Sequence, residues 1–294
     1  AQRVQARQAA LVAHTGQTES GGRAAGFSRL NSPGELDVTH GRILYLEDVT
    51  VSFDGFLALN QLDLKLEAGE LRAVIGPNGA GKTTFLDVIT GKVRPSSGQV
   101  LFKGKPLIGK PEHHIARLGI GRKFQTPRVF EKLTCRRNLE LAVAKGSSPV
   151  KLLLKPLTIE LRERVQQLLL LVGLGAHDQQ LAGGLSHGQK QWLEIAMLVA
   201  QDPELLLVDE PVAGLSDEET IHTAALLKEL SGSHTVLVIE HDMDFIRELD
   251  CPVTVLHEGH VLCEGTMETV QSDPRVIEVY LGAPEEEQPA GSAP

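Results

Sequence analysis

One segment of this sequence is more informative than any other, namely Gly76-Pro-Asn-Gly-Ala-Gly-Lys-Thr83. It follows a short apolar run, Leu71–Ile75, and precedes a helix that we expect from about Lys82 to Thr90. It therefore matches the pattern G-x-x-x-x-G-K-[ST] in the strand–loop–helix setting that this pattern requires. Glycines let the backbone curl until its N–H groups point at phosphate oxygens, and the helix start adds partial positive charge. The segment predicts a phosphate-binding loop in an α/β fold.

The chemistry of the loop assigns separate tasks to its last residues. Lys82 is expected to reach the β- and γ-phosphates of a nucleotide, and the Thr83 hydroxyl is expected to ligate Mg²⁺. The residues predicted to hold the nucleotide here are Gly76, Pro77, Asn78, Gly79, Ala80, Gly81, Lys82, Thr83 and Thr84. Taken alone, the loop is common to kinases, GTPases, helicases and transporters.

A pair of acids follows a second apolar run. Leu205–Val208 has the pattern of a buried parallel strand, and Asp209 and Glu210 come directly after it. The end of such a strand lies at the carboxyl edge of the sheet, beside the phosphate loop. We expect Asp209 to hold Mg²⁺ and Glu210 to act as the general base on the attacking water. The alternative is a solvated strand end, because Asp-Glu-Pro is also favourable turn chemistry.

The periodicity along the chain predicts the remaining architecture. Ile43–Phe53 and Leu62–Leu66 alternate apolar and polar residues as half-buried strands do. From about Leu133 to Val172 the pattern is helical. Apolar runs such as Val236–Ile239, each preceded by a helix, indicate a mostly parallel sheet covered on both faces. The predicted fold class is therefore α/β, with a helical insertion within the sheet.

Composition narrows the classes of protein. The chain has 294 residues, 41% of them hydrophobic and 23% charged, as in an ordinary globular domain. Its formal net charge of -9 argues against a sequence-independent nucleic-acid binder. Residues 1–40 and 283–294 lack sustained periodicity and are predicted to be disordered tails around a folded domain at 41–282.

Further along, Leu185-Ser-His-Gly-Gln189 opens a helix with Ser186 as a plausible N-cap. Here the sequence resembles the ATP-binding-cassette (ABC) family, because Ser186 to Gln189 match its signature motif just before the acidic strand. Gln125 matches the family's glutamine loop, His241 its switch histidine, and Phe53 the aromatic that stacks on adenine. The resemblance covers about residues 43–282.

The resemblance implies the fold and the mechanism of that family. It implies a P-loop ATPase with an antiparallel β subdomain and a helical subdomain inserted at about 126–190. It also implies a sandwich of two subunits, with each ATP lying between the phosphate loop of one and the signature helix of the other. Gln125 would sense Mg²⁺ and the lytic water, and His241 would bind the γ-phosphate. The residues that would face the nucleotide of the opposite subunit are Ser186, Gly188 and Gln189.

Several positions leave alternatives open. Either Phe53 or Phe56 would stack on the adenine, and Phe53 has the alternative role of a core aromatic. For Gln125 the alternative is a solvated amide at the end of a strand. The run Glu240-His-Asp242 contains three residue types that can bind a metal ion, but one short run cannot easily bring three such ligands together.

Two positions depart from the family pattern. His187 stands where the signature usually has glycine, and Ser216 where the family commonly has an aspartate that bridges subunits. We expect the His187 side chain to point away from the phosphate and to be structural.

Within the family, five stretches resemble the urea-uptake branch of the branched-chain-amino-acid-type importers. They are Phe85–Gly91, Gly119–Pro127, Ser186–Glu194, Asp209–Gly214 and Asp273–Gly282. The resemblance implies an ATP-hydrolysing subunit of a bacterial importer, most simply for urea, at the cytoplasmic face of the inner membrane. Its partners would be a second, non-identical ATPase subunit, two permeases and, indirectly, a periplasmic binding protein. The alternatives are the same role for branched-chain amino acids or short amides, or a soluble ABC ATPase outside transport.

Overall fold

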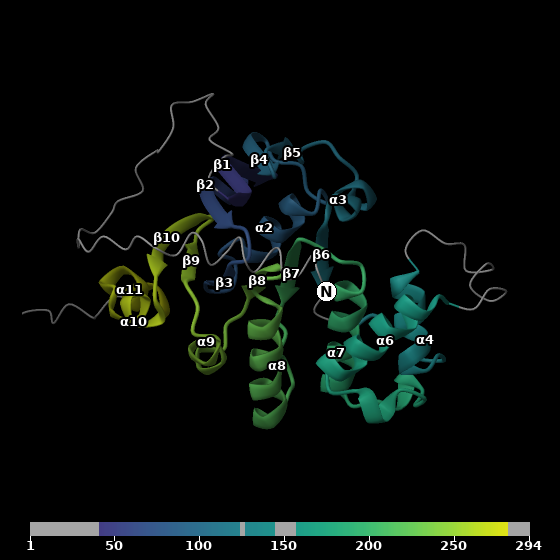
Figure 1. Ribbon diagram of the computed structural model, residues 1–294. Coiled ribbons are helices and arrows are strands. Elements are labelled where there is room, and N and C mark those ends of the chain that lie inside the picture. The colour runs from purple at the N-terminus through teal and green to yellow at the C-terminus, as the bar shows by residue number, and fades with distance from the viewer. Residues whose placement is uncertain (1–40, 124–126, 145–156, 282–294) are drawn as a thin grey trace, which may run out of the picture.

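The computed structural model describes residues 41–123, 127–144 and 157–281 (Figure 1). The predictions for residues 1–40 and 283–294 lie outside this range. An antiparallel sheet comes first in the chain, and its strand order is β2-β1-β4-β5. Its strands are β1 (Arg42–Phe53), β2 (Phe56–Glu67), β4 (Ser97–Phe102) and β5 (Lys105–Pro106). This sheet is the antiparallel β subdomain that the resemblance implied.

The second sheet has six strands in the order β10-β9-β3-β8-β7-β6. They are β3 (Leu71–Ile75), β6 (Ile120–Lys123), β7 (Leu205–Asp209), β8 (Thr235–Ile239), β9 (Val253–His257) and β10 (His260–Gly265). All neighbouring pairs are parallel except β9 and β10, and Val208 of β7 pairs with Val238 of β8. The predicted fold class, a mostly parallel α/β sheet with an antiparallel subdomain, is confirmed.

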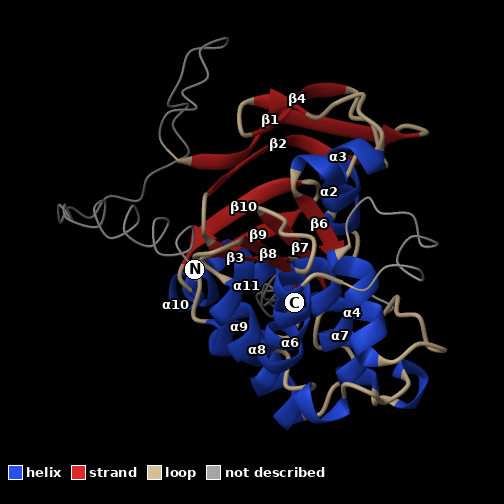
Figure 2. Cartoon of the chain, turned by 45° about the vertical axis from the view of Figure 1, so that its right-hand side comes forward, coloured by secondary structure: helices blue, strands red, loops and turns tan. Residues whose placement is uncertain are grey.

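Helices cover both faces of the six-stranded sheet (Figure 2). Helix α2 (Lys82–Ile89) and helix α3 (Glu112–Leu118) lie on the side of the antiparallel sheet, where α2 joins a core shared by both sheets. The helices on the opposite side are α4 (Cys135–Val143), α6 (Ile159–Leu171), α7 (His187–Val199), α8 (Asp217–Leu230) and α9 (Met243–Leu249). The described part of the chain ends with α10 (Met267–Ser272) and α11 (Pro274–Leu281), beside β9 and β10. Parallel strands buried on both faces explain the unbroken apolar runs of β7 and β8.

In its described residues, the segment predicted to be helical, from about Leu133 to Val172, contains two separate helices, α4 and α6. Helices α4, α6 and α7 contact one another, and Val165, Leu168 and Val172, which lie in the segment predicted to be helical, are buried. Two short 3₁₀ turns, η1 (Gly175–His177) and η2 (Ala182–Gly184), separate α6 from α7. The sequence did not predict β6, β9 or β10, which carry polar residues or glycine among their apolar ones, as in Ile120–Lys123 and His260–Gly265.

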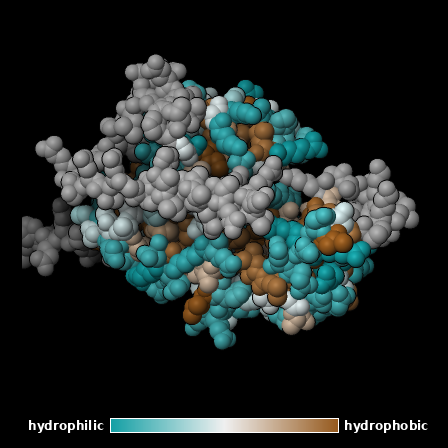
Figure 3. All heavy atoms as spheres, viewed as in Figure 1, coloured by the Kyte–Doolittle hydropathy of each residue, from teal (hydrophilic) through white to brown (hydrophobic). Residues whose placement is uncertain are grey.

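The part of the described surface that can be seen in Figure 3 is mainly polar. In the space-filling view, hydrophilic residues cover most of the visible described surface and hydrophobic residues are seen in separate patches (Figure 3). Among the described helices, none is long and apolar enough to cross a membrane.

Candidate active site

The phosphate loop runs from the end of β3 to the start of α2 and is packed tightly against two strands. A Cβ atom on Gly76 would collide with the carbonyl oxygen of Leu256 in β9. A Cβ atom on Gly81 would lie 2.5 Å from the carbonyl oxygen of Ala58 in β2, and Gly81 has φ of +99°. Both positions therefore require glycine, because any side chain would push the loop off the sheet that supports it.

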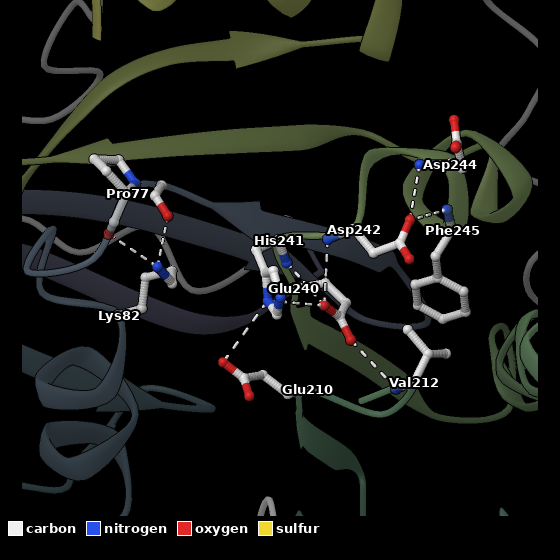
Figure 4. Close-up of polar contacts among 10 residues, drawn as sticks. Pro77, Lys82, Glu210, Val212, Glu240, His241, Asp242, Asp244 and Phe245 are labelled. Atoms are coloured by element: carbon white, nitrogen blue, oxygen red, sulfur yellow. Dashed lines mark hydrogen bonds and ion pairs between the residues drawn. The ribbon is translucent and has the colours of Figure 1, made fainter. Parts of the chain in front are cut away.

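Lys82 is the first residue of α2, and its ammonium group is folded back into the loop. Its Nζ donates hydrogen bonds to the carbonyl oxygens of Gly76, at 2.5 Å, and Pro77, at 3.0 Å (Figure 4). Burial lowers the pKa of Lys82, and the nearby carboxylates of Glu210 and Asp209 oppose this shift. A cation held inside a glycine loop at a helix N-terminus fits the phosphate groups of a nucleotide. Thr83 and Thr84 follow in the first turn, and Thr83 is exposed.

The two acids of the second motif lie where the sequence predicts them, at the end of β7. Asp209 is the last residue of the strand, and burial raises the pKa of its carboxyl group. Glu210 has φ of +44°, a conformation that costs a non-glycine residue energy. Its backbone N–H donates to the carbonyl oxygen of Ile239 at 2.9 Å, which fixes this conformation against β8. Glu210 thus leaves the strand in a left-handed conformation directly after Asp209, the last residue of β7.

Arg122 of β6 connects the phosphate helix to the acidic strand. Its guanidinium contacts Asp87 of α2 at 2.5 Å and Asp209 at 3.2 Å. All three side chains are largely buried. The sequence analysis missed both Arg122 and Asp87, since a contact between residues 35 positions apart leaves no local pattern.

His241 follows β8 and faces Glu210 across the site (Figure 4). Its Nδ1 lies 3.8 Å from Glu210 Oε1 and 3.4 Å from Glu240 Oε2, and its side chain is exposed. Lys82, Glu210 and His241, which are distant in the sequence, therefore come from adjacent strands of one sheet edge.

Glu240 is a buried carboxylate beside this group that the sequence analysis considered only as a metal ligand. It is 1% exposed, and it accepts hydrogen bonds from the backbone N–H groups of Val212, His241 and Asp242. Burial raises the pKa of this carboxyl group. Its oxygens hold the loop after β7 to the loop after β8. Within the described ranges, no group of three or more His, Cys, Asp or Glu residues is arranged to hold a metal ion.

The signature residues are at the start of α7. Ser186 is the N-cap, as predicted, and it forms a capping box with Gln189 in which each side chain bonds the backbone N–H of the other. His187 is exposed, and its Nε2 lies 3.0 Å from Nε2 of the buried Gln191 one turn along the helix. Gly188 packs against the side chain of Glu219 in α8.

The structure describes Phe53, one of the two remaining predicted site residues, but not Gln125. Phe53 and Phe56 are paired in register at the end of the β1–β2 hairpin, 48% and 65% exposed respectively. Phe53 is therefore not a core aromatic, and both rings remain available for stacking. Gln125 lies outside the described residues.

Comparison with known proteins identifies the family to which this geometry belongs. The family model for the ABC transporter matches residues 59–213, and a model for the branched-chain amino acid ATP-binding cassette transporter matches residues 260–286. The chain belongs to the ABC transporter family and is an ATPase that hydrolyses ATP. Within that family, it is the ATP-binding subunit of an importer of the branched-chain amino acid type.

Individual relatives agree with this assignment. The high-affinity branched-chain amino acid transport ATP-binding protein BraF of Pseudomonas aeruginosa is 37% identical over 249 residues, covering 82% of this chain and 98% of BraF. The crystal structure of MJ1267, an ATP-binding cassette of an ABC transporter in its ADP conformation, is 32% identical with a TM-score of 0.72. That match covers 82% of this chain and 99% of MJ1267.

A third similar protein has been solved as a dimer. The ATP-binding cassette MJ0796, in a post-hydrolysis state bound to ADP and Pi, is 26% identical with a TM-score of 0.63. The match covers 76% of this chain and 99% of MJ0796.

Proposed function

We propose that this chain contributes half of each of two ATP sites in a sandwich with a second ATPase subunit. The observation that carries this proposal is the separation of the site residues within the chain. Lys82, Glu210 and His241 gather at one edge of the sheet, whereas Ser186 and Gly188 make their contacts with α8. The dimeric state of MJ0796 supports the same arrangement.

In this arrangement each residue has a defined task. Lys82 binds the β- and γ-phosphates, Glu210 takes a proton from the attacking water, and His241 contacts the γ-phosphate. Phe53 stacks on the adenine, with Phe56 beside it. Ser186, Gly188 and Gln189 meet the γ-phosphate of the nucleotide held by the partner.

Mg²⁺ would be held by the Thr83 hydroxyl, the Asp209 carboxylate and Gln125. A hydroxyl and a carboxylate are the hard oxygen ligands that this ion prefers, so the two described residues fit it. When bound, the ion neutralises charge on the β- and γ-phosphates. Arg122 keeps the Asp209 carboxylate in place through its 3.2 Å contact.

We propose further that the helical subdomain at about 126–190 moves with its partner permease. The subunit would lie at the cytoplasmic face of the inner membrane, bound to two permeases that receive solute from a periplasmic binding protein. The second ATPase subunit is expected to be non-identical.

For the solute, the names of the relatives favour branched-chain amino acids over urea. BraF is named for branched-chain amino acid transport, and the model matching residues 260–286 carries the same description. The similarity of Ser186–Glu194 and the other quoted stretches to the urea branch keeps urea as the second candidate. An ATPase subunit does not contact the solute, so its own residues do not choose between them.

Uptake measurements test both parts of the proposal. A strain carrying the full chain with Lys82→Ala should lose accumulation of radiolabelled solute, whereas Lys105→Ala, an exposed lysine on β5, should not. Parallel assays with leucine and urea would identify the solute by which uptake is lost. Normal uptake of both in the Lys82→Ala strain would contradict the role of this chain in either system.

Glu210→Gln tests the shared site directly. The variant should bind ATP, stop turnover and remain in a closed dimer, because the water loses its base while the phosphate contacts persist. Multi-angle light scattering with ATP reports the dimer. Full ATPase activity in this variant would refute the assignment of Glu210.

A further inference from the structure

The carboxylate of Glu219 lies where the N-termini of two helices meet. Glu219 is in the first turn of α8, three residues after the N-cap Ser216. Its Oε2 accepts from the backbone N–H of Ser216 at 3.2 Å, which completes a capping box. Its Oε1 accepts from the Ser186 hydroxyl at 3.1 Å, at the N-cap of α7. One side chain thus bonds both helix starts.

The same carboxylate also covers Gly188. A Cβ atom placed on Gly188 would lie 2.6 Å from Glu219 Oε1, so the glycine is what permits the carboxylate to come this close. Helix N-termini attract anions through their partial positive charge, and here two of them face one negative group. Within the chain, Glu219 therefore accepts from the Ser186 hydroxyl, which the proposed function assigns to a phosphate, and its carboxylate packs against Gly188.

We propose that Glu219 is an internal anion that competes with the γ-phosphate of the partner's nucleotide for the signature helix. This inference rests on the proposed shared site. For the two subunits to close on ATP, the Ser186 hydroxyl must leave Glu219 and turn to the phosphate. The negative charge of Glu219 beside Gly188 also opposes the approaching phosphate. Glu219 is thus a positioning residue that raises the ATP concentration needed for closure.

The contact is suited to this exchange because it is accessible to water. The hydrogen bond between Ser186 and Glu219 is exposed, so solvent can replace it without leaving a buried polar group unsatisfied. The packing of α7 on α8 does not depend on this bond alone. Trp192 Nε1 donates to Thr223 Oγ1 at 2.9 Å, and the Trp192 ring lies 4.2 Å from the His222 ring.

Glu219→Gln separates charge from helix capping. Glutamine also completes a capping box, so α8 keeps its start, but the competing charge is lost. A net hydrogen bond corresponds to a factor of about two to ten in an equilibrium constant, and we expect KM for ATP to fall by that factor with kcat unchanged. The matched control is Glu218→Gln, which removes the same charge from the exposed neighbouring position and should leave KM as it is.

The measurement is the ATP dependence of hydrolysis by the assembled transporter, with the melting temperature of each variant as a check on folding. An unchanged KM in Glu219→Gln would overturn the inference. A raised KM would overturn it as well, because Glu219 would then hold Ser186 in its productive position. ATPase activity retained by a complex that carries Lys82→Ala would instead contradict the proposed function, so the two failures are distinguishable.

Discussion

Glu194, on the signature helix α7, should make the stability of this protein depend on pH near neutrality. Its side chain is only 5% exposed, and burial raises its pKa from 4.5 to about 7. The positive charge of Lys123 and the backbone N–H of Arg128, which donates to Glu194 Oε1 at 3.2 Å, partly oppose this shift. The folded state therefore favours the protonated carboxyl group.

The direction and the size of the effect follow from proton linkage. Because the pKa is higher in the folded than in the unfolded chain, the stability contributed by protonated Glu194 is fully present below about pH 4.5. It is lost as the pH rises through about 7. With these two values, the free energy of unfolding should fall by on the order of 1 kcal/mol between pH 6 and pH 8.

Urea denaturation at pH 6, 7 and 8 measures this change. Glu194→Gln cannot ionise, so the pH dependence due to this residue should disappear, and the difference between wild type and variant should vary by about 1 kcal/mol across the range. Glu163→Gln, an exposed position on α6, is the control and should keep the wild-type slope. Equal slopes for wild type and Glu194→Gln would refute the reasoning.

Three other substitutions test the site. Glu240→Gln should lower the free energy of unfolding by about 2 kcal/mol in urea denaturation, because an NH₂ group replaces one of the two carboxyl oxygens that accept three backbone N–H bonds. An unchanged value would mean that the loops hold without these bonds. His187→Gly should leave the pH profile of ATP hydrolysis unchanged, and a large, pH-dependent loss would show that the imidazole faces the phosphate. Gly81→Ala should abolish nucleotide binding measured by fluorescent ATP titration. Gly109→Ala, which also has positive φ but open space around it, should bind normally, and equal loss in both would rule out the clash with Ala58.

The parts of the site that the sequence predicted are those with a local pattern. The phosphate loop, the Asp209–Glu210 pair and the Ser186 cap are each contained in a few consecutive residues, and their flanking apolar runs place them on strands or helices. The parts that were missed are contacts between distant segments. Arg122 with Asp87, and Ser186 with Glu219, meet only because the sheet order and the helix packing bring them together.

The solute was less predictable than the fold for a physical reason. The residues that build a nucleotide site are the same whatever is transported, since ATP and its phosphates do not change. Part of the resemblance to urea importers lies in such residues, as in Asp209–Gly214, and the relatives' names favour branched-chain amino acids. In the proposed assembly, discrimination between solutes belongs to the permeases and the binding protein and not to this chain.

The segment between Glu210 and α8 is where the separate parts of the site are joined within one chain. The N–H of Val212 donates to Glu240, beside His241. The carbonyl oxygen of Ala213 accepts from Gln191 of the signature helix at 3.5 Å, and Ser216 is bonded to Glu219, which also holds Ser186. Residues 211–216 thus contact the loop after β8, helix α7 and helix α8. In the proposed sandwich, a shift of the signature helix on the partner's ATP would act on these residues, the first of which directly follows Glu210, the proposed general base. We therefore expect ATP binding at one site of the sandwich to change the position of Glu210, the carboxylate proposed as general base at the other site.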